Sequence, residues 1–559
     1  METKDKNERV YSYHTFLLPF EILKSDNETL CSKEEIENVL NQEYWKRLSG
    51  DHLSAFDTVI SINGIKKDDS KKKNNNLIES VVRLVEYNQE QYFHNNVKKA
   101  IHDDGKSGIV SEYVFQFDEK NTKRVIIKKF CKNIRENLNI NDESTNDNNE
   151  YVLKVSNVRL KLFNTGIGIL ILELCNDLYR NFKSVKDINE LGRHISLPYI
   201  ALENKNIASA QILIWDFLHS DEKEYNFGEK NECFLNEKSP KEKTYMVDFL
   251  KNIILKKEHR SHHDFKPSLD DRMFTCCLIQ DDGLARVYSR DYIAQKDDNA
   301  QFKKLSKYLY EYIYIDKDNS CTAATFSFRK NILNNSLYHR WTEIGTIYGA
   351  SHTSFVAITG EGEFLDTIIT WPFLTQYVEI AILVLVQRAS ILRFQKQIQS
   401  NMDNKKIQKL QSEYIDYRNQ LHFFEVSSQE QGIELYELIR KQLYIEKEME
   451  ALEKNLEILY EKSNVDNVNK FNNNVNKFNW FGVGIGIIAM LSILLDITSF
   501  ILETYTERSF CTQLYLLKYK IFWFIIIFIT FVTSVIFVTF IIYITIRYIK
   551  KNNKKHKIN

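Results

Sequence analysis

Two long apolar runs near the C-terminal end constrain the fold of this chain more than any other feature. They cover residues 480–502 and 521–546; the second contains no charged residue and the first contains one, Asp496. Each exceeds the roughly 20 residues that cross the ~30 Å hydrocarbon layer of a bilayer as an α-helix. A buried helix of a soluble protein is the alternative, but uncharged runs of this length are typical of membrane spans. We therefore predict a hairpin of two transmembrane helices.

The charges around these runs predict how the hairpin is oriented. A basic tail follows the second run, whereas the loop 503–520 mixes both signs; the basic residues of the tail are Arg547, Lys550, Lys551, Lys554, Lys555 and Lys557. Basic segments beside a span stay on the cytoplasmic side. The first residues are too polar for a signal peptide, so we expect both termini in the cytoplasm and a two-span protein of the inner or plasma membrane.

The composition limits the expected partners of the protein and predicts the redox state of its cysteines. The 75 basic and 75 acidic residues balance, so no global field attracts nucleic acid, and we expect no direct binding to it. The eight cysteines face a reducing compartment in this topology, which predicts free thiols rather than disulfides.

The positions of the prolines suggest the domain organisation. All five lie before residue 373, and the rest of the chain has none, as expected for long helices. We predict an α/β cytoplasmic sensor domain over 1–372 and a long helical stalk over 373–479. Transmembrane helices at 480–502 and 521–547, joined by the loop 503–520, and a tail over 548–559 complete the chain.

Periodicity predicts the main elements of these regions. Strands are expected at 11–20, 113–117, 124–130, 151–155, 158–163, 273–279, 321–328 and 354–359. Helices are expected at 32–48, 168–182, 245–257 and 301–312. Residues 66–76 and 141–150 are low in complexity and are predicted to form loops. Residues 380–386 are apolar all round but too few to cross a bilayer, which predicts a buried helix.

The stalk contains a seam of residues spaced alternately three and four apart. Its members are Leu435, Leu438, Gln442, Ile445, Met449, Leu452, Leu456 and Leu459. Such a seam needs a partner helix, either within the chain or from a neighbouring subunit, and we favour self-association. Downstream, the sequence NVNKFN occurs at 467–472 and again at 474–479. This heptad repeat predicts a helix that continues into the membrane, with a flexible linker as the alternative because Asn is a weak helix former.

One polar stripe runs along the first apolar run. It consists of Ser492, Asp496, Ser499 and Glu503, which share one helix face. A charge at mid-span costs roughly 2.5–3.5 kcal/mol on insertion scales, so such residues usually face a helix bundle or a water-filled path. In a symmetric oligomer the stripe would line a pore, and a ring of Asp496 carboxylates would attract cations. Alternatively, Asp496 reaches the outer headgroups and the serines bond to backbone carbonyls.

This architecture resembles the CorA family of divalent-cation channels. The shared features are a large cytoplasmic α/β domain, a long helix that runs into the first of two C-terminal spans, and a lysine-rich tail. The resemblance implies a homopentamer whose first span lines the pore. However, the family's Gly-Met-Asn signature at the outer end of that span is missing, because residues 499–503 read SFILE. Ordinary magnesium uptake is therefore in doubt.

Several short sequence segments are similar to those of a divergent CorA-like branch that accompanies type III CRISPR defence systems. They lie at 13–20, 159–170, 188–197, 269–274, 341–355 and 387–394. The resemblance implies an antiviral membrane effector that is an ion channel and not an enzyme. It also implies a nucleotide second messenger, an adenylylated S-adenosylmethionine, as the gating ligand, with opening of the channel disturbing ion balance.

The candidate ligand residues lie in four segments. Asn164, Thr165 and Gly166 follow a predicted strand and precede a predicted helix, so their N–H groups suit an anion, unless they form a plain tight turn. Where the branch has Gly-Arg-Arg-Ile, this chain has Arg193 followed by His194, whose charge depends on pH. Arg193 suits a phosphate, and Asp270, Asp271 or Arg272 suit ribose or amine groups, unless these residues form an internal salt-bridge cluster. Thr346 and Tyr348 lie in a glycine-flanked segment that could let the backbone approach a ligand, although turn chemistry explains it equally well.

Two other functions remain open at this point. One is a constitutive transporter of divalent metal cations. The other is a membrane-tethered hydrolase that uses His259, His262 and His263, although no HExxH, paired CxxC or P-loop motif accompanies them. We predict no catalytic residues, no resident metal and no certain cofactor, with a divalent cation as a possible permeant ion.

Overall fold

The computed structural model describes residues 10–25, 29–48, 91–116, 124–129, 150–193, 211–215, 253–291, 300–316, 321–399, 404–503, 519, 522–531, 537–538 and 541. The predicted loops at 66–76 and 141–149, the hairpin loop at 504–518, the tail, and most of the predicted helix 245–257 lie outside these residues. The chain divides into two compact units, Met1–Ser463 and Asn464–Asn559.

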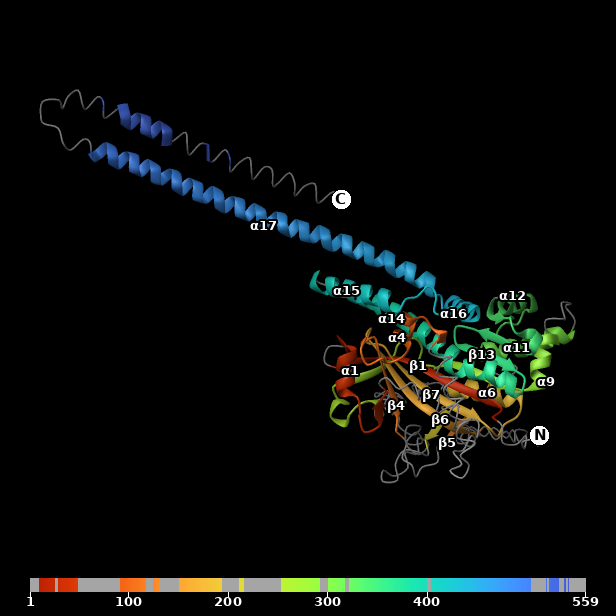
Figure 1. Ribbon diagram of the computed structural model, residues 1–559. Helices are drawn as coiled ribbons and strands as arrows, with labels where there is room; N and C mark the ends of the chain where they lie inside the picture. Colours follow the sequence, from red (N-terminus) through yellow and green to blue (C-terminus); the bar gives the residue numbers. More distant parts are fainter. Residues whose placement is uncertain are drawn as a thin grey trace, which may run out of the picture. The chain divides into compact units, whose positions relative to one another are not determined.

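The first unit is built on one sheet of 13 described strands. Along its main path the strands are ordered β11 (Leu337–Tyr338), β12 (Ile347–Ala350), β13 (Ser354–Thr359), β10 (Phe274–Gln280), β1 (Ser12–Lys24), β7 (Gly168–Asn176), β6 (Glu150–Phe163), β4 (Val110–Phe115) and β3 (Trp45–Arg47). Figure 1 labels β13, β1, β7, β6 and β4 of this path. Off this path, β2 (Thr29–Leu30) and β9 (His263–Pro267) pair with β1, and β5 (Arg124–Lys129) pairs with β6 and β8 (Gln211–Trp215). Among these pairs, β10 and β13 run parallel and the others antiparallel.

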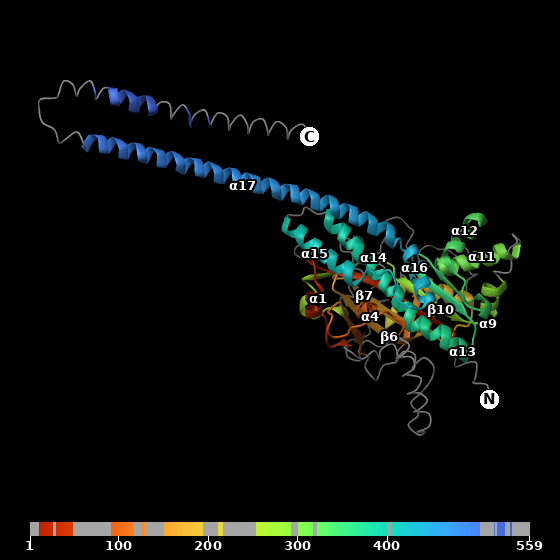
Figure 2. The same ribbon diagram turned by 45° about the horizontal axis from the view of Figure 1, so that its top comes forward.

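Helices cover both faces of this sheet. On one face lie α4 (Asn95–Ile101), α14 (Val378–Gln399), α15 (Asn404–Gln420) and α16 (Glu430–Gln442), as Figure 2 shows. On the other lie α1 (Lys33–Val39), α6 (Phe182–Arg193), α11 (Ala300–Ile313) and α12 (Phe326–Ser336). The side chains of β1 alternate between the two cores, with Leu17 beneath α14 and Phe16 beneath α6. This three-layer arrangement confirms the predicted α/β class of the N-terminal region.

Short helical segments connect these layers. They are η1 (Lys257–His259), α9 (Asp282–Ala285), η2 (Arg286–Asp291), η3 (Thr342–Ile344), α13 (Glu363–Leu365), η4 (Asp366–Thr370) and η5 (Phe373–Tyr377).

Several predicted elements differ from the structure. The predicted helix at 32–48 ends at Val39, and Trp45–Arg47 form strand β3 instead. The predicted helix at 168–182 is strand β7, all nine residues of which are buried. A central strand that is covered on both faces shows a continuous apolar run instead of alternation, and such a run is also typical of a buried helix. The predicted strand at 321–328 overlaps α12, in which Arg329, Leu333 and Ser336 are buried one helical turn apart.

A buried ion cluster ties α14 to the sheet. Arg159 and Lys161 of β6 are 2% and 0% exposed, and both reach Glu379 of α14, at 2.9 and 2.6 Å. Arg159 also pairs with Glu112 and Glu173, each at 2.8 Å. The charged face of β6 is therefore an interior face.

The seam in the stalk packs within the chain. Leu435, Ile445, Met449, Leu452 and Leu456 are buried in the same core as α14 and α15. This core explains why the first unit extends to Ser463, whereas the sequence predicted a boundary after Pro372. The predicted buried helix at 380–386 is confirmed as the centre of α14.

The last helix, α17 (Ile445–Glu503), is continuous from the seam to the end of the first apolar run. The NVNKFN repeats are therefore helical. Two helical stretches of the described chain are long and apolar enough to cross a membrane, Glu363–Gln399 and Ile445–Ser499. The first is 78% buried over its apolar window and contains α14, a core helix of the first unit, whereas the second has none of that window buried. In the second apolar run, residues 522–531, 537–538 and 541 are helical.

Candidate functional site

A small cavity of about 90 Å³ opens where the end of α6, the middle of α14 and the link between α16 and α17 meet the sheet. Its polar lining comes from segments far apart in the sequence: Arg193, Asp270, Arg272, His352, Thr353 and Arg388. Pro19 of β1, Leu385 of α14 and Leu443, two residues before α17, supply apolar walls. Three of the ten predicted ligand residues thus lie together, namely Arg193, Asp270 and Arg272.

Close helix packing positions Arg193. The residue before it, Gly192, lies so near β1 that a Cβ atom there would approach Phe16 Cζ to 2.0 Å. The side chain of Phe16 is fully buried, so only glycine allows α6 to end at this point. The carbonyl of Arg193 accepts a hydrogen bond of 2.8 Å from the N–H of Met273, which fixes the loop that carries Asp270 and Arg272.

The parallel pairing of β10 with β13 brings His352 to the same place. Thr275 at the start of β10 donates its N–H to the carbonyl of Thr353 at 3.0 Å. His352 and Thr353 belong to the turn between β12 and β13, which Ser351 closes by a 2.8 Å hydrogen bond to Ser354. The turn and the loop before β10 therefore share one edge of the cavity.

Arg193 is a buried cation with unused hydrogen-bonding capacity. It is 5% exposed, and among the described residues its Nε atom has no hydrogen-bond partner. Burial, with a further contribution from the charge of Arg272, lowers the pKa of Arg193 to about 10. The guanidinium therefore stays charged at neutral pH, and desolvation disfavours that charge unless an anion compensates it.

The other two arginines of the cavity already have carboxylate partners. Arg272 pairs with Asp270 at 2.8 Å, with both side chains more than 40% exposed. Arg388 Nη1 forms an ion pair of 3.1 Å with Glu448 Oε1 in the first turn of α17. The charges of Arg388, Arg193 and Arg272 all act on His352 and, after burial, lower its pKa. Taken together, the lining is suited to an anion.

The predicted turn at Asn164–Gly166 lies elsewhere and has internal partners. The N–H groups of Asn164 and Gly166 donate to Ile109 and Phe163, and Arg393 of α14 donates to the carbonyl of Thr165. Gly166 has a φ of 75°, and a Cβ there would approach the carbonyl of Cys31 to 2.7 Å. The turn thus fastens α14 to the sheet and does not line the cavity.

The remaining predicted ligand residues are also apart from the cavity. Thr346 is fully buried and its hydroxyl lies 2.7 Å from that of Thr359. Tyr348 is 1% exposed in the core beside α14. Asp271 lies in the loop before β10 but is not among the lining residues, and His194 lies outside the described residues.

Sequence reasoning missed His352, Arg388 and Glu448. His352 and Arg388 lie within the segments 341–355 and 387–394, but the resemblance of these segments implies no role for either residue. The usable signal for Arg388 was a single cation within the apolar stretch of residues 380–392. Glu448 gave no such signal, since it is one of many acidic residues in the stalk.

The histidine-rich segment does not form a metal group in the part of the chain that the structure describes. His259 ends η1 and His263 begins β9, and His263 Nδ1 lies 3.0 Å from the carbonyl of His259. No set of three or more His, Cys, Asp or Glu side chains is placed to hold a metal ion among the described residues.

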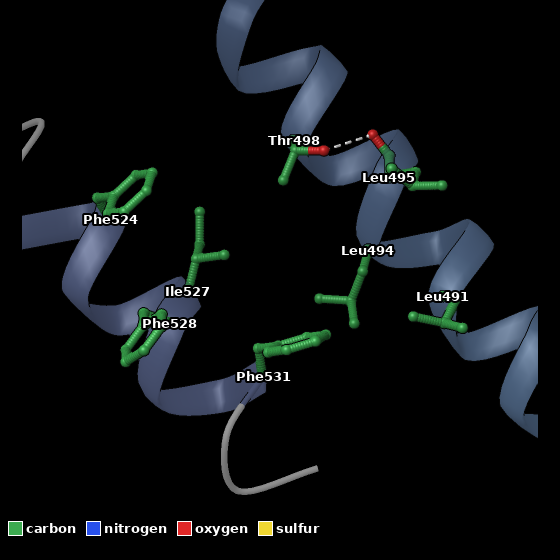
Figure 3. Close-up of a pocket in the computed structure, with 8 residues that line it drawn as sticks. All are labelled: Leu491, Leu494, Leu495, Thr498, Phe524, Ile527, Phe528 and Phe531. Atoms are coloured by element: carbon green, nitrogen blue, oxygen red, sulfur yellow. Dashed lines mark hydrogen bonds between the residues drawn. The ribbon is translucent and has the colours of Figure 1, made fainter. Parts of the chain in front are cut away.

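The two helices of the hairpin pack through apolar side chains. Leu491, Leu494, Leu495 and Thr498 of α17 face Phe524, Ile527, Phe528 and Phe531 across a pocket of about 240 Å³ (Figure 3). At about 100° per residue, the stripe Ser492, Asp496, Ser499 and Glu503 is centred roughly 120° away from this contact face. Ser492, Asp496 and Ser499 are exposed in the single chain, and Ser499 donates its hydroxyl to the carbonyl of Asp496 at 2.9 Å.

Comparison with protein-family models, with curated proteins and with solved structures finds no match to this chain.

Proposed function

We propose that this protein is a homo-oligomeric membrane ion channel whose opening is controlled by a small anionic, nucleotide-like ligand bound in the cavity. One observation carries the proposal. The cavity holds a buried Arg193 whose Nε has no hydrogen-bond partner among the described residues, and its wall includes Leu443 and Arg388, which adjoin the helix that continues into the membrane-length segment. A ligand that binds there contacts Leu443, two residues before α17, and Arg388, the ion-pair partner of Glu448 in its first turn, and so can couple the cavity to α17.

The exposed faces of α17 support assembly around a pore. The polar stripe with Asp496 lies away from the partner helix of the hairpin, so a neighbouring copy can meet it. Upstream, Val468, Phe471, Val475 and Phe478 are 57%, 67%, 39% and 77% exposed. Because the seam at Leu435–Leu459 packs within the chain, we assign self-association to this downstream face and the spans instead. We propose a pentamer, as in the CorA family that the chain resembles.

The finer identity follows from the resemblance. We propose an antiviral effector of the CorA-like type that accompanies type III CRISPR systems, which responds to adenylylated S-adenosylmethionine and disturbs membrane ion balance when it opens. The basic cavity supports this ligand class, because guanidinium groups recognise phosphoryl groups. Tyr444, 51% exposed, and His352 place two aromatic rings 6.4 Å apart beside it, which suits a base or ribose.

Reconstitution tests the proposal. We expect purified protein in liposomes to conduct ions only when adenylylated S-adenosylmethionine is present on the side of the first unit. Arg193→Gln should abolish the response, whereas Arg286→Gln, a change outside the cavity lining, should keep it. Conductance that is equal with and without the ligand would instead indicate a constitutive transporter and would sink the proposal.

A further inference from the structure

The size of the cavity limits which part of a ligand it can enclose. Sites for whole small molecules span roughly 300–1,000 Å³, and this cavity measures about 90 Å³. It therefore encloses a single compact group. Its buried end is cationic, because Arg193 is 5% exposed and its Nε has no partner among the described residues.

Charge selects the chemistry of that group. Arg193, Arg272 and Arg388 line the cavity together with one carboxylate, Asp270, which is already paired with Arg272. A phosphoryl group carries up to two negative charges and several acceptor oxygens, which match the forked donors of arginine. A neutral sugar or amide group would add no negative charge beside Arg193, whose desolvation the charges of Asp270 and Glu190 offset only in part.

Glu448 is placed to compete with such a group. Its carboxylate pairs with Arg388 Nη1 at 3.1 Å, with side chains 12% and 31% exposed, so a phosphoryl group in the cavity and this carboxylate would share the same guanidinium. Gln395 donates a second contact to Glu448 at 2.9 Å. Both contacts hold the first turn of α17, directly after Tyr444, a non-glycine residue with a φ of 57° that separates α16 from α17.

We propose that the cavity is a subsite for one phosphoryl group, and that this group and the carboxylate of Glu448 compete for Arg388. Occupancy of the cavity releases the Arg388–Glu448 contact at the base of α17. For its consequence at the membrane, the inference rests on the proposed channel function.

Titration calorimetry on the full-length protein tests the competition without any measurement of conductance. Inorganic phosphate is titrated into the protein in one series of measurements, and AMP is titrated in a second series. We expect Glu448→Gln to tighten phosphate binding by two- to fivefold, as the loss of one partly exposed ion pair allows. Glu446→Gln is the matched control in the same helical turn, since Glu446 pairs with Arg440 outside the cavity, and it should leave the affinity unchanged.

Further variants and a competition measurement test whether the cavity binds a phosphoryl group. Arg193→Lys should weaken phosphate binding at least tenfold in a protein that melts normally, and in an Arg388→Gln background Glu448→Gln should have no effect. AMP and phosphate should compete; AMP binding more tightly assigns the group to a nucleotide, and equal affinities assign it to free phosphate. Weaker binding by Glu448→Gln, or equal effects of the two glutamate variants, would overturn the inference. Competition as expected, in a protein that never conducts, would overturn the channel function alone.

Discussion

At the scale of single residues, the clearest structural demand is the charge cluster on β6. Burial alone would raise the pKa of Glu379, but the charges of Lys161 and Arg159 lower it, so the carboxylate is ionised. We predict that Glu379→Gln destabilises the protein by about 3–5 kcal/mol, because both cations then lose a buried partner. Thermal unfolding of the detergent-solubilised protein measures this, with Glu363→Gln on an exposed site as the control. A loss no larger than that of the control would contradict the cluster.

We predict that the buried side chain of His14 makes the stability of the folded protein depend on pH. It is fully buried in β1, with Nδ1 2.7 Å from Asn189 Oδ1 and Nε2 2.9 Å from Ser12 Oγ. Burial lowers its pKa from 6.5 to about 4. The unfolded chain binds a proton first, so this stability is complete above pH 6.5 and is lost as the pH falls toward 4, by about 3 kcal/mol.

Melting temperatures between pH 7.5 and pH 4 check this expectation. His14→Gln should lower stability at pH 7.5 but flatten its decline with acid. His262→Gln, which replaces an exposed histidine, should keep the decline of the natural protein. An unchanged decline in His14→Gln would assign the acid sensitivity to other groups.

At the scale of elements, we predict that the seam at Leu435–Leu459 stabilises the folded chain and does not join subunits. Leu452 is fully buried in the core that contains α14 and α15, whereas Ile458 on the same helix is 57% exposed. Leu452→Ala should cost about 2–5 kcal/mol of stability and Ile458→Ala less than 1 kcal/mol. Because the packing is within the chain, the loss should not depend on protein concentration. A loss that disappears at high concentration would return the seam to a subunit interface.

The sequence predicts elements well where the pattern is local. The strands β10, β13 and β6 follow from alternation or from β-branched and aromatic runs, and α11 follows from its helical period. Strand β7 could not be predicted in this way, since helices on both faces remove the alternation. Strand β6 does alternate, but alternation alone does not tell that its charged face, with Arg159 and Lys161, is buried. This charged face of β6 is buried because α14 packs over it.

The candidate site could be predicted only in part. Arg193, Asp270 and Arg272 were predicted from a resemblance, and the cavity brings them together. His352, Arg388 and Glu448 could not be predicted, because they reach the site through strand pairing and helix packing between segments more than 100 residues apart from Arg193. Conversely, the turn at Asn164–Gly166 looked like an anion site only while the residues that occupy its N–H groups were unknown.

At the scale of the whole molecule, α17 is the element on which the proposed function depends, since one helix contains both Glu448 and Asp496. If the polar stripe lines a pore, the carboxylate of Asp496 sets the preference for cations. We predict that Asp496→Asn lowers the cation-over-anion selectivity at least severalfold, without changing phosphate binding at the cavity. Reversal potentials of the reconstituted protein under a salt gradient measure the selectivity.

Two further variants separate the pore from the packing of the hairpin. Thr498→Val lies on the face of α17 that meets Phe524–Phe531, so it should leave the selectivity as it is. Asp496→Glu retains the charge and should retain the preference for cations. If Asp496→Asn conducts with the natural selectivity, the carboxylate does not face the permeation path. Asp496 would then lie near the headgroups, and the pore, if there is one, would be lined by another face of the helix.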